Sequence, residues 1–127
     1  MELIKNSYIY WEFIRNLRNM DGVRQSFIQQ LQITVEEHEL FMKKNSNMFF
    51  VCIEKERTLG FIGVISDDIR IATHPDHQGK GVAAFMLDEM MKKNPRAFAK
   101  VKADNEASLR LFESCGFVKK YYIFEQN

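Results

Sequence analysis

The feature that most constrains the fold of this sequence is a series of three short apolar runs that ends in a glycine-bearing loop. The runs are rich in β-branched and aromatic side chains, which strands favour, and they cover residues 47–54 (NMFFVCIE), 58–66 (TLGFIGVIS) and 69–73 (IRIAT). Polar turns separate them at Lys55-Glu56-Arg57 and Asp67-Asp68. Because connections this short join antiparallel neighbours, the sequence predicts an antiparallel meander.

The rest of the chain alternates between helical and strand-like patterns. Apolar residues at helical spacing predict helices at 8–18, 34–44, 82–93 and 105–115. A capping box at Thr34 and Glu37 begins the second of these helices, and Asn105 caps the last. We expect further strands at 2–5, 96–103 and 117–124. This order predicts an α/β fold in which helices cover the faces of a mixed sheet.

Chain length and charge distribution restrict the class of protein. At 127 residues the chain is expected to form a single domain, residues 1–127. Its 18 basic and 17 acidic side chains are interspersed, whereas a nucleic-acid partner needs a basic face. No apolar stretch approaches the roughly 20 residues that cross a bilayer, and the N-terminus lacks the basic start and apolar run of a signal peptide. We therefore expect a cytoplasmic protein with neither nucleic acid nor membrane as a partner.

The cysteines and histidines give no sign of a metal site. His38, His74 and His77 do not have the spacing of metal ligands. Cys52 lies in an apolar run and Cys115 in the last turn of a predicted helix. We interpret both as free thiols of a reducing compartment, with a disulfide left open as the alternative.

The segment from His74 to Ala83 (HPDHQGKGVA) carries the clearest chemical signal. It joins a predicted strand to a predicted helix, and its glycines allow the backbone to turn sharply and approach a ligand. The first amides of the helix lack intrahelical partners and the helix dipole favours negative charge there, so the segment predicts a diphosphate site, to which Lys80 adds a positive charge. It matches neither a Walker A loop nor a dinucleotide-binding fingerprint. The alternative is a glycine turn that only closes a strand-to-helix connection.

Two motifs in this part of the chain resemble the signatures of one enzyme family. The segment Gln78–Ala83 (QGKGVA), with His74-Pro75-Asp76 before it, resembles the acetyl-CoA loop of the GNAT superfamily of N-acetyltransferases. The segment Asn105–Phe117 (NEASLRLFESCGF) resembles the second signature of that family. The resemblance covers roughly residues 49–117, and it implies the GNAT fold with acetyl-CoA as co-substrate and no metal.

The resemblance implies roles for named residues in binding the coenzyme. The backbone of one strand would pair with the pantetheine arm, through Ile71, Ala72 and Thr73. The amides of the loop would hold the diphosphate, from Gln78, Gly79, Lys80, Gly81, Val82 and Ala83. The second signature adds the coenzyme-binding residues Asn105, Ser108 and Phe112. Alternative interpretations are a plain helix cap for Asn105 and a solvated side chain for Lys80.

The catalytic residues are less well marked than the coenzyme site. An acidic residue on the strand before the loop serves as the base in many members of the family, and Asp67 and Asp68 occupy that neighbourhood, where two turn residues are the alternative. The tyrosine that commonly acts as the acid is replaced by Phe112, which cannot donate a proton. Tyr122 is our candidate in its place, with Tyr121 and Cys115 as other nearby groups.

We expect the amine acceptor to bind beside the N-terminal helices. The polar residues there are Arg15, Asn16, Arg18, Asn19 and Arg24, next to Trp11 and Phe27, and arginines suit a phosphate group. For each single residue the alternative is a solvated helix face. The leading hypothesis is acetylation of a primary amine of a small molecule, with an amino sugar nucleotide as one candidate, by direct attack in a ternary complex. The alternatives are acetylation of a protein or peptide N-terminus, a catalytically silent acyl-CoA-binding module, and a nucleotide-binding domain unrelated to CoA.

The C-terminal part predicts one strand fewer than the family usually has. Only about ten residues follow Gly116, whereas the resemblance implies a two-stranded hairpin. Either the sheet is shorter, or a partner subunit supplies the edge. Because an unpaired sheet edge invites association, we favour a homodimer.

Overall fold

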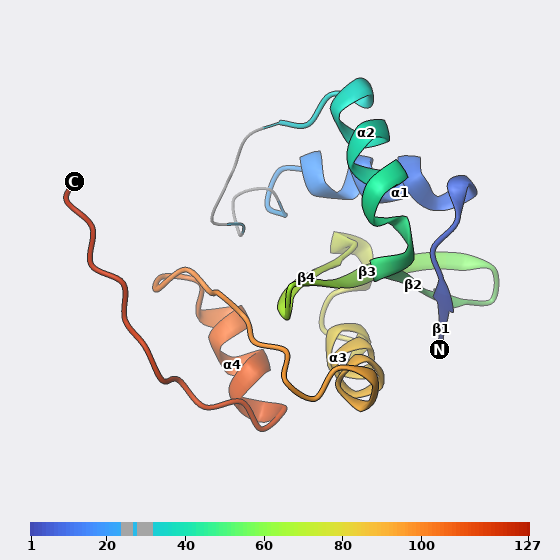
Figure 1. Cartoon of the computed structure of the whole chain (residues 1–127). Helices are drawn as coiled ribbons and strands as arrows, with labels where there is room; N and C mark the ends of the chain where they lie inside the picture. Colours follow the sequence, from blue (N-terminus) through green and yellow to red (C-terminus); the bar gives the residue numbers. More distant parts are fainter. Residues whose placement is uncertain (24–26, 28–31) are drawn as a thin grey trace.

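Four strands form one antiparallel sheet whose order follows the chain (Figure 1). The structure is a computed structural model that describes residues 1–23, 27 and 32–127. The strands are β1 (Glu2–Lys5), β2 (Phe49–Glu54), β3 (Arg57–Ile65) and β4 (Asp68–Thr73). The α-helices of the described part are α1 (Trp11–Asn19), α2 (Val35–Asn45), α3 (Val82–Lys93) and α4 (Glu106–Ser114), and its short 3-10 helices are η1 (Tyr8–Tyr10), η3 (Ser46–Met48) and η4 (Pro75–His77).

Helices α1 and α2 cover one face of the sheet and α3 covers the other (Figure 1). Side chains alternate between faces along each strand, so Phe61 and Ala72 pack under Ile14 and Leu17 of α1. On the opposite face the core contains Cys52, Leu59, Ile62, Val64 and Ile69 of the sheet with Val82, Met86, Leu87 and Met90 of α3. The mixed α/β fold predicted from the sequence is confirmed, and the named strands of the sheet are all antiparallel.

Local signals in the sequence explain where two of the helices begin. Thr34 Oγ1 accepts a hydrogen bond from Glu37 N at 3.1 Å, and the Glu37 carboxylate accepts one from Thr34 N, so the predicted capping box is present. Asn105 Oδ1 accepts from Ser108 N at 3.1 Å and caps α4. Both helices start at the predicted residues because a side chain satisfies an amide that the helix leaves unpaired.

The first hairpin turn is one residue shorter than the sequence predicted, and the second is shifted by one residue. Glu54 pairs with Arg57 and Ile65 pairs with Asp68, so only two residues form each turn. All four turn residues (Lys55, Glu56, Ser66, Asp67) have positive φ, between 51° and 66°, which matches the twist of adjoining strands. The predicted turn Asp67-Asp68 is therefore wrong by one residue: the turn is Ser66-Asp67, and Asp68 is the first residue of β4.

The predicted strand at 96–103 is wrong. Within the described residues only Phe98 pairs with the sheet, through a single parallel bridge to Asp68. Ala97, Ala99 and Val101 still face the α3 side of the core, as the alternation predicts. The ladder stops because this segment moves away from β4 after Phe98 and a cavity separates the two.

The predicted strand at 117–124 is also wrong in the described structure. After α4 the chain runs along the outside of the domain (Figure 1). Phe117 packs partly buried against the core on the α3 side, whereas the apolar side chains after it are exposed, from 75% at Val118 to 94% at Phe124. No described segment lies beside it to supply the hydrogen bonds that an extended backbone needs.

The two cysteines lie in different environments. Cys52 is buried, Cys115 is half-buried and both are free thiols, and burial raises the pKa of the Cys52 thiol. Among the described residues, no helix has both the length and the apolar character needed to cross a bilayer.

Candidate functional site

The loop between β4 and α3 presents a row of backbone amides. His74 begins the short turn η4, where its Nδ1 accepts from Asp76 N at 3.1 Å. Gly79 and Gly81 follow with φ of +76° and +81°. In the described part of the chain, no amide from residue 79 to residue 84 donates to a backbone carbonyl, and Phe85 N is the first to do so, to Gly81 O at 3.0 Å. Such a loop at a helix N-terminus suits an anion.

The two glycines of this loop are required by backbone conformation. Both φ values fall in the left-handed region, which residues with a Cβ rarely adopt. Apart from the adjacent residues of the chain, no described heavy atom lies within 4 Å of a Cβ built at either position. The space beside the loop is therefore open to a ligand. Lys80 lies between the glycines and is exposed. These observations fit the diphosphate site predicted from the sequence.

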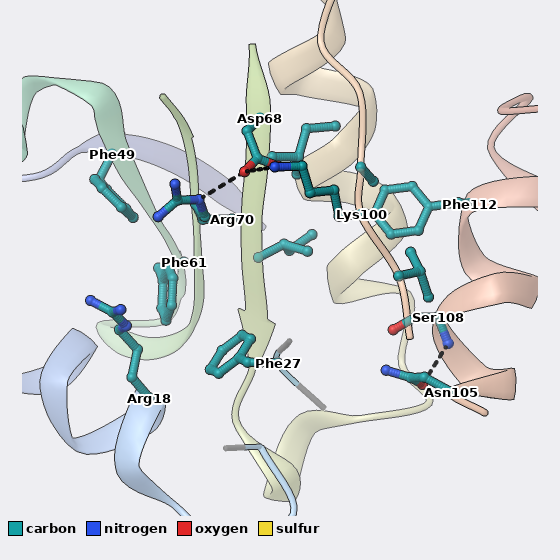
Figure 2. A pocket seen from close by; sticks show the side chains of 14 residues that line it. Arg18, Phe27, Phe49, Phe61, Asp68, Arg70, Lys100, Asn105, Ser108 and Phe112 are labelled. Carbon is teal, nitrogen blue, oxygen red and sulfur yellow. Dashed lines mark hydrogen bonds and ion pairs between the residues drawn. The ribbon is translucent and has the colours of Figure 1, made fainter. Parts of the chain in front are cut away.

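A cavity arises where β4 and the segment after α3 separate. Phe98 N donates to Asp67 O at 2.8 Å and Ile69 N donates to Phe98 O at 2.9 Å, and the pairing then ends. Between the diverging segments lies a cavity of about 320 Å³ (Figure 2). Its described lining residues are Arg18, Phe27, Phe49, Phe61, Asp68, Ile69, Arg70, Ile71, Ala99, Lys100, Val101, Asn105, Ser108 and Phe112.

The cavity reaches both faces of the sheet. Asp68 and Arg70 lie on the face that α1 and α2 cover, because β4 alternates and Ala72 packs there. Ile69 and Ile71 point to the face of α3, where Ala99, Val101 and Phe112 also pack. Figure 2 shows Arg18 on one side of β4 and Asn105, Ser108 and Phe112 on the other. One molecule can therefore enter along α3 and α4 while another enters from α1.

The charged side chains gather on the α1 side of the cavity. Asp68 Oδ2 lies 3.5 Å from Arg70 Nε and 3.8 Å from Lys100 Nζ, and the Asp68 side chain is 18% exposed. The Arg18 guanidinium lies 5.3 Å from the centre of the Phe41 ring. Burial, together with the nearby charge of Arg70, lowers the pKa of Arg18. Among the described residues no carboxylate lies within ion-pair distance of Arg18.

The structure brings together part of the predicted catalytic and coenzyme-binding set. Asp68, Ile71, Asn105, Ser108 and Phe112 line the cavity. Phe112 is 8% exposed and its ring meets that of Phe117 edge-on, with 5.2 Å between the centroids. Because Asn105 caps α4, one of its contacts is structural, as the alternative interpretation proposed.

Other predicted residues lie outside the cavity. Asp67 is in the tight turn with φ of +66°, and Tyr122 is 75% exposed in the segment after α4, where its ring lies 5.8 Å from Lys119 Nζ. Ala72 packs into the α1 face of the core. The Thr73 hydroxyl is buried without a partner among the described residues. Of the predicted acceptor group, Arg18 and Phe27 line the cavity, whereas Arg24 lies outside the described residues.

Sequence reasoning missed Arg70 and Lys100 as cavity residues. Arg70 is the single charged residue of the otherwise uncharged run IRIAT, which is a signal that it faces a polar space. Lys100 lies between Ala99 and Val101 in an alternating segment, a pattern that is also typical of a solvated strand face. Among the described residues, no group of three or more potential metal ligands occurs.

Comparison with known proteins gives concordant results. The family model described as "Acetyltransferase (GNAT) family" matches residues 10–117. The spermidine N(1)-acetyltransferase of Vibrio cholerae is 25% identical over 132 residues, which cover 90% of this chain and 76% of that protein.

Solved structures share the fold. The crystal structure of spermidine N-acetyltransferase from Vibrio cholerae in complex with CoA and spermine matches with a TM-score of 0.86 at 22% identity, over 98% of this chain and 85% of that one. Ribosomal-protein-alanine N-acetyltransferase from Brucella melitensis matches with a TM-score of 0.79 at 13% identity, over 91% and 83% of the two chains.

Proposed function

Because this chain belongs to the GNAT family of acetyltransferases, we propose that it transfers an acetyl group from acetyl-CoA to a primary amine of a small molecule. The observation that carries the proposal is the cavity between β4 and residues 98–101, which reaches both faces of the sheet, together with the row of backbone amides before α3. Two substrates can therefore reach the cavity from opposite faces of the sheet. This arrangement supports direct attack in a ternary complex.

The loop before α3 would hold the diphosphate of acetyl-CoA. Amides that donate to no backbone carbonyl, two glycines with open space and the dipole of α3 all favour an anion there. The pantetheine arm would follow β4 into the cavity, past Ile71, Asn105 and Ser108. Acetyl-CoA supplies the acetyl group in an activated form, as a thioester.

The amine that receives the acetyl group must lose a proton to a base during the reaction. Transfer forms a bond between the amine nitrogen and the acetyl carbon and breaks the carbon–sulfur bond, so nitrogen must lose a proton and sulfur must gain one. The carboxylate of Asp68 lines the cavity on the side of α1, where Arg70 and Lys100 orient it, and it would accept the proton directly or through water. Phe112 cannot supply the proton to sulfur, which would come from solvent or from another group.

Measurement of thiol release from acetyl-CoA with a panel of amines tests this function. The panel contains small primary amines, an amino sugar nucleotide and a peptide with a free N-terminus. We expect turnover with small amines, and Asp68→Asn should lower kcat by roughly 10²- to 10⁴-fold, the usual contribution of a positioned base. The matched control is Asp104→Asn, because Asp104 is 81% exposed and outside the cavity.

Three other outcomes of this assay would each change one part of the proposal, either the base, the acceptor or the catalytic activity itself. A loss of activity in Asp67→Asn but not in Asp68→Asn would transfer the role of base to Asp67. Turnover with the peptide alone would identify a protein N-terminus as the acceptor. Binding of acetyl-CoA without turnover of any amine would favour a catalytically silent acyl-CoA-binding module.

We also propose that the chain forms a homodimer. The apolar side chains of Val118, Ile123 and Phe124 are exposed, and pairing with a partner subunit would bury them and satisfy the backbone of their segment. Sedimentation equilibrium tests this by comparing the measured mass with the 15.0 kDa of one chain. A mass that stays at that of one chain at high protein concentration contradicts the dimer.

A further inference from the structure

The described residues that line the cavity carry more positive than negative charge, and one of these cations has no counterion among the described residues. Its described ionisable lining residues are Arg18, Asp68, Arg70 and Lys100. The single carboxylate, Asp68, already contacts Arg70 and Lys100. Arg18 has no carboxylate within ion-pair distance and donates no hydrogen bond to any residue that the structure describes. A partly buried guanidinium without a partner is costly, so a ligand anion would be strongly favoured beside it.

The surroundings of Arg18 hold its guanidinium ready for a ligand. The group lies over the Phe41 ring at 5.3 Å from its centre, a stacked arrangement that limits the conformations of the arginine side chain. The planar fork of donors suits a carboxylate or a phosphate, which accepts two parallel hydrogen bonds. The walls nearby are apolar, formed by Phe49 and Phe61. A negatively charged group therefore has one clear place to bind on this side of the cavity.

Arg18 lies on the side from which the acceptor would enter. It belongs to α1, which packs on the face of the sheet that carries Asp68 and Arg70 (Figure 2). The loop proposed for the diphosphate begins α3, on the opposite face. The anion that Arg18 would bind therefore belongs to the acceptor and not to the coenzyme.

We propose that the acceptor is an amine that also carries an acidic group, a carboxylate or a phosphate, and that Arg18 binds this group while the amine lies toward Asp68. This inference rests on the proposed acetyl transfer and names the class of its substrate. It separates the chain from the Vibrio cholerae relative, whose name gives spermidine as its substrate. A polyamine carries only positive charge, and it would meet Arg18, Arg70 and Lys100, which a single carboxylate among the described lining residues offsets.

Matched pairs of amines test the inference. We would compare an amino acid with its carboxamide, an amino sugar phosphate with the free amino sugar, and both pairs with spermidine. The acidic member of at least one pair should have the higher kcat/KM by roughly 10- to 100-fold, the contribution of a hydrogen-bonded charge pair. The first pair reports a carboxylate and the second a phosphate.

Substitution of Arg18 locates the effect. Arg18→Gln should remove the advantage of the acidic amine through a higher KM for that amine, with the KM for acetyl-CoA and the activity toward the uncharged partner nearly unchanged. The control is Arg110→Gln, since Arg110 is 73% exposed on α4 and pairs with Glu106 outside the cavity. Calorimetric titration of the CoA-loaded protein with the acidic amine gives a second readout that requires no turnover, and Arg18→Gln should weaken this binding by a similar factor.

Three results would overturn the inference. The first is a higher kcat/KM for spermidine or for the uncharged amines. The second is a higher KM for acetyl-CoA in Arg18→Gln with no change for the acceptor, which would assign Arg18 to the coenzyme. The third is CoA-loaded protein that binds none of the acidic amines. Failure of the proposed acetyl transfer has a different signature, because no amine of any charge would then be acetylated.

Discussion

Substitution of Gly63 by alanine would test the packing of the wall of the cavity. Gly63 pairs directly with Phe49 across β2 and β3. A Cβ at Gly63 would lie 2.6 Å from two carbons of the Phe49 ring, so the ring would have to move by about 0.8 Å to reach an ordinary contact of about 3.4 Å. Phe49 is 2% exposed and lies between the rings of Phe41 and Phe61, each 5.9 Å away between centroids. The ring has little room to move.

The expected cost of this substitution follows from the cost of overpacking a core. Overpacking destabilises by about 1–3 kcal/mol, and we take about 2 kcal/mol. An unfolding entropy of roughly 2.1 cal/mol/K for each of the 127 residues then converts this loss into a fall in Tm of about 7 °C. Because Phe49 also lines the cavity, the KM for the acceptor should rise as well.

Thermal unfolding followed by circular dichroism measures the effect. The control is Gly116→Ala, where φ is +91° and no heavy atom lies within 4 Å of the added Cβ, so only the left-handed backbone contributes, at about 1 kcal/mol. A Tm for Gly63→Ala within about 2 °C of the wild type would refute the reasoning. It would mean that the three phenylalanine rings in contact adjust freely.

Three further predictions follow from single residues. Burial lowers the pKa of His38, although its Nε2 lies 2.8 Å from Trp11 O. The unfolded chain therefore binds a proton at this histidine more readily than the folded chain does. The free energy of unfolding should fall as the pH drops below about 6.5, by at most about 1.4 kcal/mol per pH unit. Urea unfolding at about pH 7.5 and pH 5 should show a smaller loss in His38→Gln, and equal losses would contradict this. Glu56→Gly should raise the free energy of unfolding by about 1 kcal/mol because Glu56 has φ of +66°, and an unchanged midpoint of urea unfolding would argue against strain in that turn. Phe112→Tyr should raise kcat by up to roughly 10²-fold if its hydroxyl protonates the leaving sulfur, with the KM for acetyl-CoA little changed; a stable variant with unaltered kcat would show that this proton is not limiting.

Much of the fold was predictable because its signals are local. The capping box of Thr34 and Glu37 marks the start of α2 within four residues of sequence, and Asn105 does the same for α4. The apolar runs of β2, β3 and β4 differ from the helical segments in their period. Each of these signals acts between neighbours in the chain, so one sequence is enough to detect it.

The errors concern pairing between distant segments. Residues 96–103 alternate like a strand, yet only Phe98 pairs with β4, because hydrogen bonding depends on how far the two segments diverge. The position of the tight turn at Ser66 and Asp67 decides the surroundings of Asp68. A shift of one residue moves a side chain to the other face of a sheet, so the difference between Asp67 in the turn and Asp68 in the cavity could not be predicted from the pair of aspartates alone.

The candidate site also has a part with local signals in the sequence and a part that depends on the tertiary fold. Gln78–Ala83 and Asn105–Phe117 are continuous motifs, and the sequence identified both. The charged side of the cavity combines Arg18 of α1, Asp68 and Arg70 of β4, and Lys100 of the segment after α3. These residues come together only through the tertiary fold, which explains why Arg70 and Lys100 were missed.

Calorimetric titration of the purified protein with CoA is the most direct test, because the proposed function depends on the binding of a diphosphate by the amides before α3. We expect one CoA to bind per chain, ATP to bind at least about tenfold more weakly, and Gly81→Val to weaken CoA binding at least about tenfold by its effect on a backbone with φ of +81°. Gly116→Ala, a glycine of similar φ outside the loop, should bind CoA as the wild type does. An absence of CoA binding, or equal affinities of the wild type and Gly81→Val, would contradict the account.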